Sequence, residues 1–371
     1  MGRSLKSHAK VQRLGWRLAI CAALLVWVFH NIFVNEGRSA WGAGSPAWEQ
    51  LSRLDQWRAA WRLGPPALWQ NLAVVQLWAL LVSVLIMGVT IFLGAFRWLI
   101  ALRVQGLRLP WGRALRISLV AHFFNSFLLG STGGDLIKAY YAARETAHRK
   151  TEAIVTVFVD RVVGLWTMLL FAIIMVVPNL ELLRTHDRLR LLLFAIAGMF
   201  VAGSGFVGLA FWGGLSRGWR SARERLRRLP KGEWLERSLE SCREFGRHRR
   251  FFLRMVMVSM ALNVVCVSQY LVLASGMGFT VPVEVWFLAV PAIICISALP
   301  ITPNGLGVRE NLYVAILAAA PFLIPHAAAL AISLLAYAGS LLWSIVGGIV
   351  YLFFKQREHL EEVTVGEPAD S

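Results

Sequence analysis

Long apolar stretches, interrupted by short basic segments, dominate the chain between residues 16 and 354. A helix of about twenty apolar residues crosses a hydrocarbon core roughly 30 Å thick, and lipid leaves the backbone few alternatives to a helix. The pattern predicts six full membrane spans, at 16–34, 71–96, 152–177, 189–212, 254–275 and 327–354. We therefore expect an all-α fold, a polytopic membrane helix bundle.

Two further apolar regions are too short to cross the membrane as single helices. Residues 117–130 have basic residues on both flanks and lead into Ser-Thr-Gly-Gly-Asp at 131–135. Residues 285–299 break at Pro-Ile-Thr-Pro-Asn-Gly-Leu-Gly (300–307), before a second run at 312–320. Because positive charge stays cytoplasmic, the first region is expected to enter from the cytoplasm and return, and the second to enter from outside. This predicts two re-entrant helical hairpins in an inverted repeat; the alternative is eight or more full spans.

Changes of composition divide the chain into six parts. They are a cytoplasmic N-terminus with the first transmembrane helix (1–34), an outer Trp-rich interfacial segment (35–70), a first membrane repeat with a linking helix (71–213), a basic cytoplasmic loop (214–253), a second membrane repeat (254–354) and an acidic cytoplasmic tail (355–371). The first apolar stretch could also be a signal peptide cut near Ala40 or Ala43. Its continuation through Phe33 favours an uncleaved anchor.

Two of the polar parts contain amphipathic patterns. In 35–70, Ser45-Pro46 predicts a helix start, and Trp48, Trp57 and Trp61 follow at helical spacing. We expect this helix to lie in the outer interface, with an ordinary loop helix as the alternative. The basic loop is predicted to form two helices against anionic headgroups, or else a solvated loop.

The composition agrees with a membrane protein, since 57% of residues are apolar and 16% are charged. The net charge of +17 is concentrated in the connecting segments and no nucleic-acid motif accompanies it, so no nucleic-acid partner is expected. The four cysteines and eight histidines lack the spacing of a disulfide framework or a metal site. We expect no metal and no cofactor.

The first of three polar clusters lies at the first break. It contains Asn125, Gly133, Gly134, Asp135 and Lys138. The glycines allow the backbone to turn and leave amide groups at a helix start, where an anion is favoured. Asp135 is alternatively a helix cap only.

The second cluster is Asp160-Arg161, about 12 Å of helix beyond Glu152 and so near the middle of a span. Adjacent helix residues point about 100° apart, so these two need not pair with each other. Ionisable groups at that depth face a partner or a water-filled cavity. The alternative is a structural ion pair with another helix.

The third cluster follows the second break, with Asn304, Gly305, Gly307, Arg309 and Glu310. The planar fork of Arg309 suits a phosphate. Glu310 could pair with Arg309 or with a cation of the other clusters. The alternative is a salt bridge that only locks the hairpin.

These motifs resemble the lysylphosphatidylglycerol synthase transmembrane region family of flippase-like membrane proteins. The resemblance rests on Asn125 with Gly133-Gly134-Asp135, on Asp160-Arg161-Val-Val-Gly-Leu at 160–165, and on residues 300–310, and it covers about 70–354. It implies a polytopic protein that handles anionic lipid or lipid-linked headgroups. The Trp-rich segment 35–70 and Lys138, where an Arg is expected, depart from the family's pattern.

The resemblance implies a protein that binds and translocates an anionic phospholipid or lipid-linked headgroup across the bacterial inner membrane. The expected phosphate-binding residues are Gly133, Gly134, Lys138, Arg161, Asn304, Gly305, Gly307 and Arg309. The residues expected to set charge balance are Asp135, Asp160 and Glu310. Alternatives are an enzyme of phospholipid or polyprenyl-phosphate chemistry, with Asp135 or Asp160 as base, and a partner of a separately encoded transferase. Without a soluble aminoacyl-transferase domain, lipid aminoacylation by this chain alone is not expected.

Overall fold

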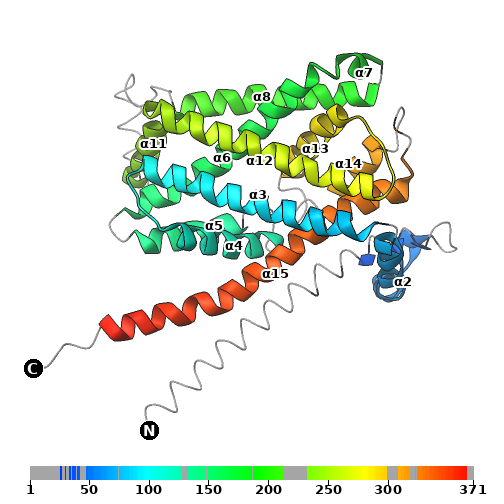
Figure 1. Ribbon diagram of the computed structural model, residues 1–371, viewed down its shortest axis with the longest axis horizontal. Helices are drawn as coiled ribbons and strands as arrows, with labels where there is room; N and C mark the ends of the chain where they lie inside the picture. The colour runs from blue at the N-terminus through cyan, green and yellow to red at the C-terminus, as the bar shows by residue number, and fades with distance from the viewer. Residues whose placement is uncertain are drawn as a thin grey trace, which may run out of the picture.

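The computed structural model is a bundle of helices, several of which run side by side along the molecule (Figure 1). The structure describes residues 47–73, 75–127, 133–146, 149–185, 187–211, 232–298, 308–317 and 324–365, with single positions between 26 and 41 and residue 322. The helices of these residues are the 3-10 turn η1 (Trp48–Gln50), α2 (Arg53–Ala73), α3 (Leu77–Val104), α4 (Trp111–Phe127), α5 (Gly133–Glu145), α6 (Lys150–Val176), α7 (Leu180–Thr185), α8 (Asp187–Phe211), α11 (Gly232–Arg247), α12 (Arg249–Gly276), α13 (Val283–Ser297), α14 (Val308–Leu317) and α15 (His326–Val365).

Five of these helices are long and apolar enough to cross a membrane. The crossing segments are Leu77–Val104, Lys150–Val176, Leu193–Phe211, Arg249–Gly276 and Ala328–Phe353. They correspond to five of the six predicted spans. The remaining one, 16–34, falls almost entirely outside the described residues.

The long helices α3 and α12 end in the same way. Gly106 follows α3 with φ +68°, and the Leu107 amide donates to the Leu102 carbonyl over 2.9 Å. Gly278 follows α12 with φ +80° and the same arrangement of bonds. A left-handed glycine lets the chain leave the helix while the last carbonyls keep partners. Both helices therefore end at defined positions, and α3 extends well beyond residue 96.

Helices α4 and α5 form an antiparallel pair. Arg113 near the start of α4 bonds Glu145 at the end of α5, with 2.6 Å between Nε and Oε1. At the other end Gly134 packs on Ala121, where an added Cβ would lie 1.9 Å from the carbonyl oxygen. With 17 and 13 residues, the helices are about 26 and 20 Å long, which is less than a hydrocarbon core. Neither helix is among the five candidate spans.

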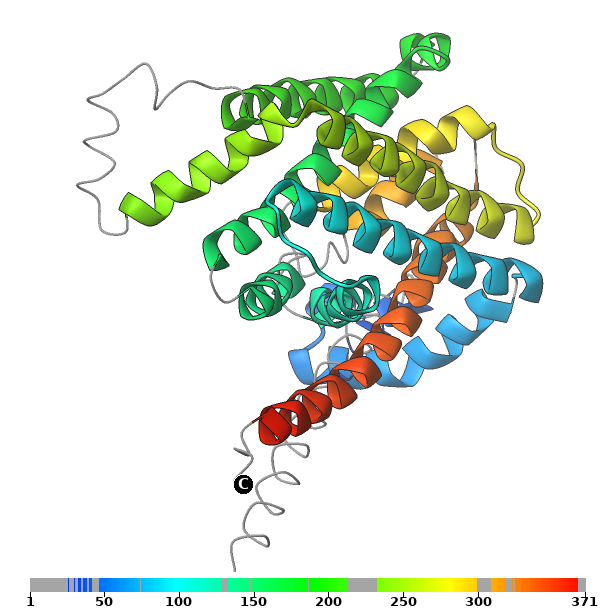
Figure 2. The ribbon, with the colours of Figure 1, turned by 60° about the vertical axis from the view of Figure 1, so that its left-hand side comes forward.

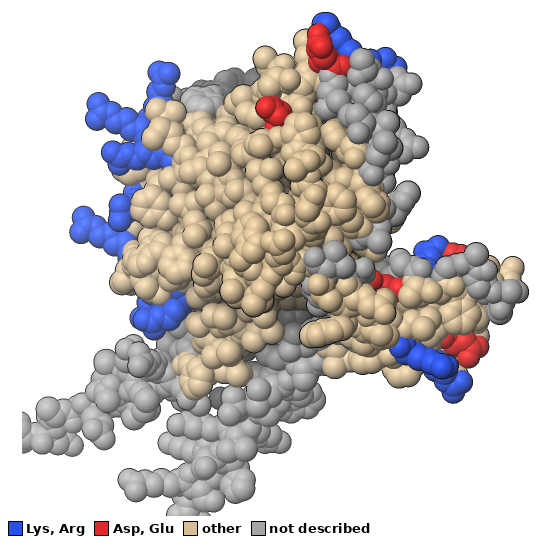
Figure 3. All heavy atoms as spheres, turned by 45° about the vertical axis from the view of Figure 1, so that its right-hand side comes forward, with Lys and Arg blue, Asp and Glu red and all other residues tan. Residues whose placement is uncertain are grey.

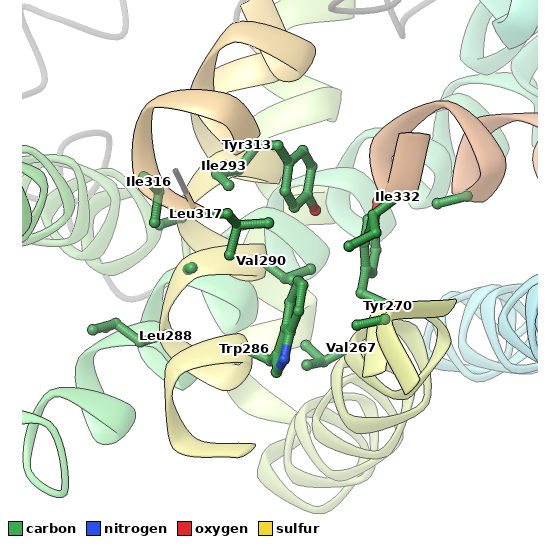
Figure 4. Close-up of a cluster of buried hydrophobic side chains, with 14 of the residues drawn as sticks. Val267, Tyr270, Trp286, Leu288, Val290, Ile293, Tyr313, Ile316, Leu317 and Ile332 are labelled. Carbon is green, nitrogen blue, oxygen red and sulfur yellow. The ribbon is translucent and has the colours of Figure 1, made fainter. Parts of the chain in front are cut away.

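Helices α13 and α14 are the second short pair, with 15 and 10 residues. They lie in the opposite half of the molecule from α4 and α5 (Figure 1). Trp286 of α13 and Tyr313 of α14 are fully buried in the apolar core shown in Figure 4, beside Tyr270 of α12. The rings of Tyr270 and Tyr313 stack with centroids 5.1 Å apart. Aromatic packing therefore fixes the second pair against the long helices.

Helix α15 crosses the bundle obliquely and projects beyond it at its C-terminal end (Figure 2). One of its faces carries Ser333, Tyr337, Ser340 and Ser344, spaced by four, three and four residues. This spacing places the four side chains on one stripe of the helix. Farther along α15, Gly347 packs so closely on α4 that a Cβ would lie 2.1 Å from the Leu119 carbonyl oxygen.

The Trp-rich segment differs in detail from its prediction. Its helix α2 begins at Arg53 rather than at Pro46, because the Ser52 hydroxyl accepts the Asp55 amide as an N-terminal cap. Trp48 lies in the separate turn η1 and is buried, whereas Trp57 is half exposed. In the basic loop the second expected helix is α11, and the first lies outside the described residues.

Basic side chains collect at one end of the molecule, along one edge of the view in Figure 3. They come from the ends of α3 and α5, the starts of α4, α6 and α12, and α11. The exposed members are Arg103, Arg108, Arg116, Arg144, Arg149, Lys150, Arg247, Arg249, Arg250 and Arg254. Helices α2 and α7 lie at the other end (Figure 1).

Candidate functional site

Asp160 is the centre of a buried charge cluster between α3, α5 and α6. Its Oδ1 accepts from Arg97 Nε over 2.7 Å, and its Oδ2 accepts from Lys138 Nζ over 3.3 Å. The three side chains are only 9–12% exposed. Arg97 also donates to the Ser259 hydroxyl of α12 over 3.1 Å. Buried charges are stable only when they are paired and hydrogen-bonded, as they are here.

Arg97 was not among the predicted site residues, because it lies directly after the predicted second span, 71–96. The residues that follow it, Trp-Leu-Ile-Ala-Leu at 98–102, are apolar and buried. This apolar continuation was the signal that could have placed Arg97 inside the helix. Gly164 of α6 makes room for it, since an added Cβ would lie 2.8 Å from the guanidinium.

The side chain of Lys138 is held on two sides. Its ammonium lies 4.5 Å from the ring centroid of Trp98, within range of a cation–π interaction. The indole of Trp98 donates to the Thr156 hydroxyl over 3.2 Å. Lys138 is therefore placed by an aromatic ring and by Asp160, between α3 and α6.

A second ion pair joins α5 and α6 beside the first. Arg161 Nε lies 3.7 Å from Asp135 Oδ2, and the side chains are 32% and 25% exposed. Asp160 and Arg161 thus pair with different residues, in agreement with their orientation on a helix. The structure brings four predicted site residues together here: Asp135, Lys138, Asp160 and Arg161.

The glycines before Asp135 serve the turn into α5. The Gly134 amide donates to Asn125 Oδ1 over 2.7 Å, so it is already bonded within the protein. Gly133 and Gly134 are both buried. The close contact of Gly134 with α4 requires the absence of a side chain. In this structure the Gly134 amide helps to fold the α4–α5 pair, and it is not one of the free amides expected for an anion.

Arg309 and Glu310 form a separate charged pair at the start of α14. Arg309 Nη2 lies 2.6 Å from Glu310 Oε1, and the side chains are 13% and 4% exposed. Arg309 also donates to the Ser333 hydroxyl over 3.3 Å and lies 4.6 Å from the ring centroid of Tyr337. Of the partners considered for Glu310, the structure shows Arg309. Asn304, Gly305 and Gly307 lie outside the described residues.

Polar side chains of α15 contact both short helix pairs. Ser333 and Tyr337 contact Arg309 of α14, as described above. On the same stripe, Ser340 bonds His122 of α4, with 3.2 Å between its carbonyl oxygen and the imidazole Nε2. Ser344 bonds Ser126, one turn farther along α4. Helix α15 thus contacts the Arg309–Glu310 pair at α14 and the polar residues His122 and Ser126 of α4.

Further polar contacts join the long helices. Gln269 of α12 donates to the Ser83 hydroxyl of α3 over 3.2 Å and to the Ala336 carbonyl of α15 over 3.3 Å. Asn263 of α12 donates to the Thr167 carbonyl of α6 over 3.2 Å. Within the described part of the chain, no group of three or more His, Cys, Asp or Glu side chains is arranged to hold a metal ion.

Comparison with known proteins identifies the family. A search of curated proteins found no match. The family described as the lysylphosphatidylglycerol synthase TM region matches residues 54–353. These residues include the charge cluster, the Arg309–Glu310 pair and the five long apolar helices. Because the match covers most of the chain, this multi-pass membrane protein belongs to the lysylphosphatidylglycerol synthase TM region family.

Proposed function

We propose that this protein binds the phosphate of an anionic phospholipid or lipid-linked headgroup inside the membrane and carries it across the bacterial inner membrane. The observation that supports this function is the charge of the cluster between α3, α5 and α6. It contains three cations, Arg97, Lys138 and Arg161, and two carboxylates, Asp135 and Asp160. Counted over these five residues, one positive charge is in excess, and a phosphate monoanion would neutralise it.

An excess charge at this depth is costly without an anion. A charged group in a membrane costs at least about 2.5 kcal/mol, and it usually marks a substrate pathway. Arg161 of α6 is the most accessible cation of the cluster. Lys138 lies on the adjacent helix, α5. In the proposal these two side chains contact the phosphate, while Asp160, itself held by Arg97, positions Lys138.

The proposed topology places both termini and the basic end of the molecule in the cytoplasm. The α4–α5 pair is a hairpin that enters from the cytoplasmic side, and α13–α14 is a hairpin of opposite orientation in an inverted repeat. The lengths of the four helices support this, since each is shorter than the roughly 30 Å core. Arg309, with Asn304, Gly305 and Gly307, would offer the second contact for the headgroup.

Cysteine labelling tests this topology. Arg108 and Lys150 flank the α4–α5 pair and are exposed. In intact cells, Arg108→Cys and Lys150→Cys are both expected to resist a membrane-impermeant maleimide and to react after permeabilisation. Labelling of Lys150→Cys from outside would mean that only one of the two helices crosses.

Lipid flipping in reconstituted vesicles tests the site. Lys138→Gln removes the excess charge, while its amide can still donate to Asp160. We expect the flipping rate of fluorescent phosphatidylglycerol to fall about tenfold, the effect of roughly 1.4 kcal/mol on a barrier. Lys150→Gln, which removes an exposed lysine at the start of α6, is the matched control and should keep the wild-type rate. Equal rates for Lys138→Gln and the control would contradict the proposed site.

A further inference from the structure

Two ion pairs join α5 and α6, and they differ in which helix supplies the cation and in how exposed they are. In one, Lys138 of α5 meets Asp160 of α6, which Arg97 also holds, and the side chains are at most 12% exposed. In the other, Asp135 of α5 meets Arg161 of α6 over 3.7 Å, with 25% and 32% exposure. A distance of 3.7 Å is too long for a hydrogen bond. The Asp135–Arg161 pair is the looser and more accessible of the two.

The position of Asp135 is determined by contacts between the start of α5 and α4. Asp135 is the third residue of α5, directly after Gly134. The bond from the Gly134 amide to Asn125 and the contact of Gly134 with Ala121 fix the start of α5 against α4. The carboxylate of Asp135 would therefore remain near Arg161 even if the guanidinium turned to another anion.

We propose that Asp135 is a built-in competitor of the lipid phosphate for the guanidinium of Arg161. This inference rests on the proposed function. Carboxylate and phosphate both offer two oxygens to the planar fork of an arginine, so they compete for the same donors. The loose pair with Asp135 weakens phosphate binding and assists release. A transporter needs such weakening, because its substrate must leave the site as well as reach it.

Neither Asp160 nor Glu310 suits this role. Asp160 accepts from two cations and is 10% exposed. Glu310 is 4% exposed and lies 2.6 Å from Arg309. Displacing either would leave a cation without its nearest carboxylate in a buried place. Among these three, Asp135 is the most exposed and has the longest contact with its cation.

The test is Asp135→Asn, which keeps the shape of the side chain and removes its charge. Binding is measured in detergent micelles that contain fluorescent phosphatidylglycerol or, for comparison, zwitterionic phosphatidylcholine. The variant is expected to bind phosphatidylglycerol up to about fivefold more tightly than the wild type, the upper end of what a partly exposed ion pair contributes. Its flipping rate should fall, because release becomes slower.

Glu145→Gln is the matched control, since Glu145 is the acid at the other end of α5 and pairs with Arg113. It removes the same charge away from Arg161 and should leave binding unchanged. A parallel measurement with glycerol phosphate in zwitterionic micelles shows whether the ligand is a lipid headgroup or any soluble phosphate. Tightening for glycerol phosphate alone would overturn the inference for lipid.

The remaining outcomes separate the inference from the proposed function. If the wild type prefers phosphatidylglycerol but Asp135→Asn binds equally or more weakly, the competitor role is wrong and the proposed function stands. If the wild type shows no preference for phosphatidylglycerol, both are wrong. Asp135→Ser is the second variant. If neither Asp135 variant folds, as judged by monodisperse elution and thermal unfolding, the role of Asp135 is structural and the inference is overturned.

Discussion

The closest contact between α4 and α5 offers a quantitative test of how this hairpin-like pair is built. In Gly134→Ala the new Cβ would lie 1.9 Å from the Ala121 carbonyl oxygen and 2.7 Å from the Asn125 side chain. Because such contacts need about 3 Å or more, the helices must separate by roughly 1 Å. That movement also stretches the bond from the Gly134 amide to Asn125. Overpacking of this kind typically costs about 1–3 kcal/mol.

Thermal unfolding in detergent measures this cost. At about 2 °C per kcal/mol for a large domain, the midpoint should fall by roughly 2–6 °C. Gly205→Ala is the matched control, because Gly205 of α8 has no atom within 4 Å of the added Cβ. Alanine is the better helix former, so the control should be neutral or stabilised by up to about 1 kcal/mol. If Gly134→Ala is as stable as Gly205→Ala, the close packing of α4 on α5 is wrong.

Two further predictions concern the charge cluster and α11. Asp160→Asn leaves Arg97 and Lys138 without their shared carboxylate and should destabilise the protein by about 3–5 kcal/mol in thermal unfolding; wild-type stability would contradict the pairing. Burial raises the pKa of the Cys242 thiol in α11 to about 11, so little of the reactive thiolate forms at about pH 8. Peptide mapping should show maleimide on Cys242 only after unfolding, and rapid labelling of the folded protein would mean that α11 detaches from its neighbours.

The positions of the long helices were largely predictable from the sequence. The expected spans 152–177 and 254–275 correspond to Lys150–Val176 and Arg249–Gly276. Lipid imposes a minimum length on apolar helices, so composition alone locates them. The predicted second span ended at residue 96, where the charged Arg97 interrupts the apolar run, whereas α3 continues through Val104 with this arginine paired inside the bundle.

The pairing of the charged residues could not be predicted in the same way. The sequence identified Asp160 and Arg161 as residues that lipid does not tolerate unpaired, and both have partners. Which partners they have depends on how α3 and α5 pack on α6, and no local pattern encodes that packing. Arg97 and Asp160 are 63 positions apart in the chain. The sequence patterns indicated that the buried charges must be paired. Tertiary packing determines which residues form the pairs.

The polar stripe of α15 has a mechanical consequence. Ser333 contacts Arg309 in one half of the molecule, and Ser344 contacts Ser126 in the other. The two serines are eleven residues apart on one continuous helix, a distance of about 16 Å. Helix α15 therefore contacts one short helix pair at each of two positions along its length. Because one continuous helix contacts both short helix pairs, a tilt of α15 would displace both pairs together.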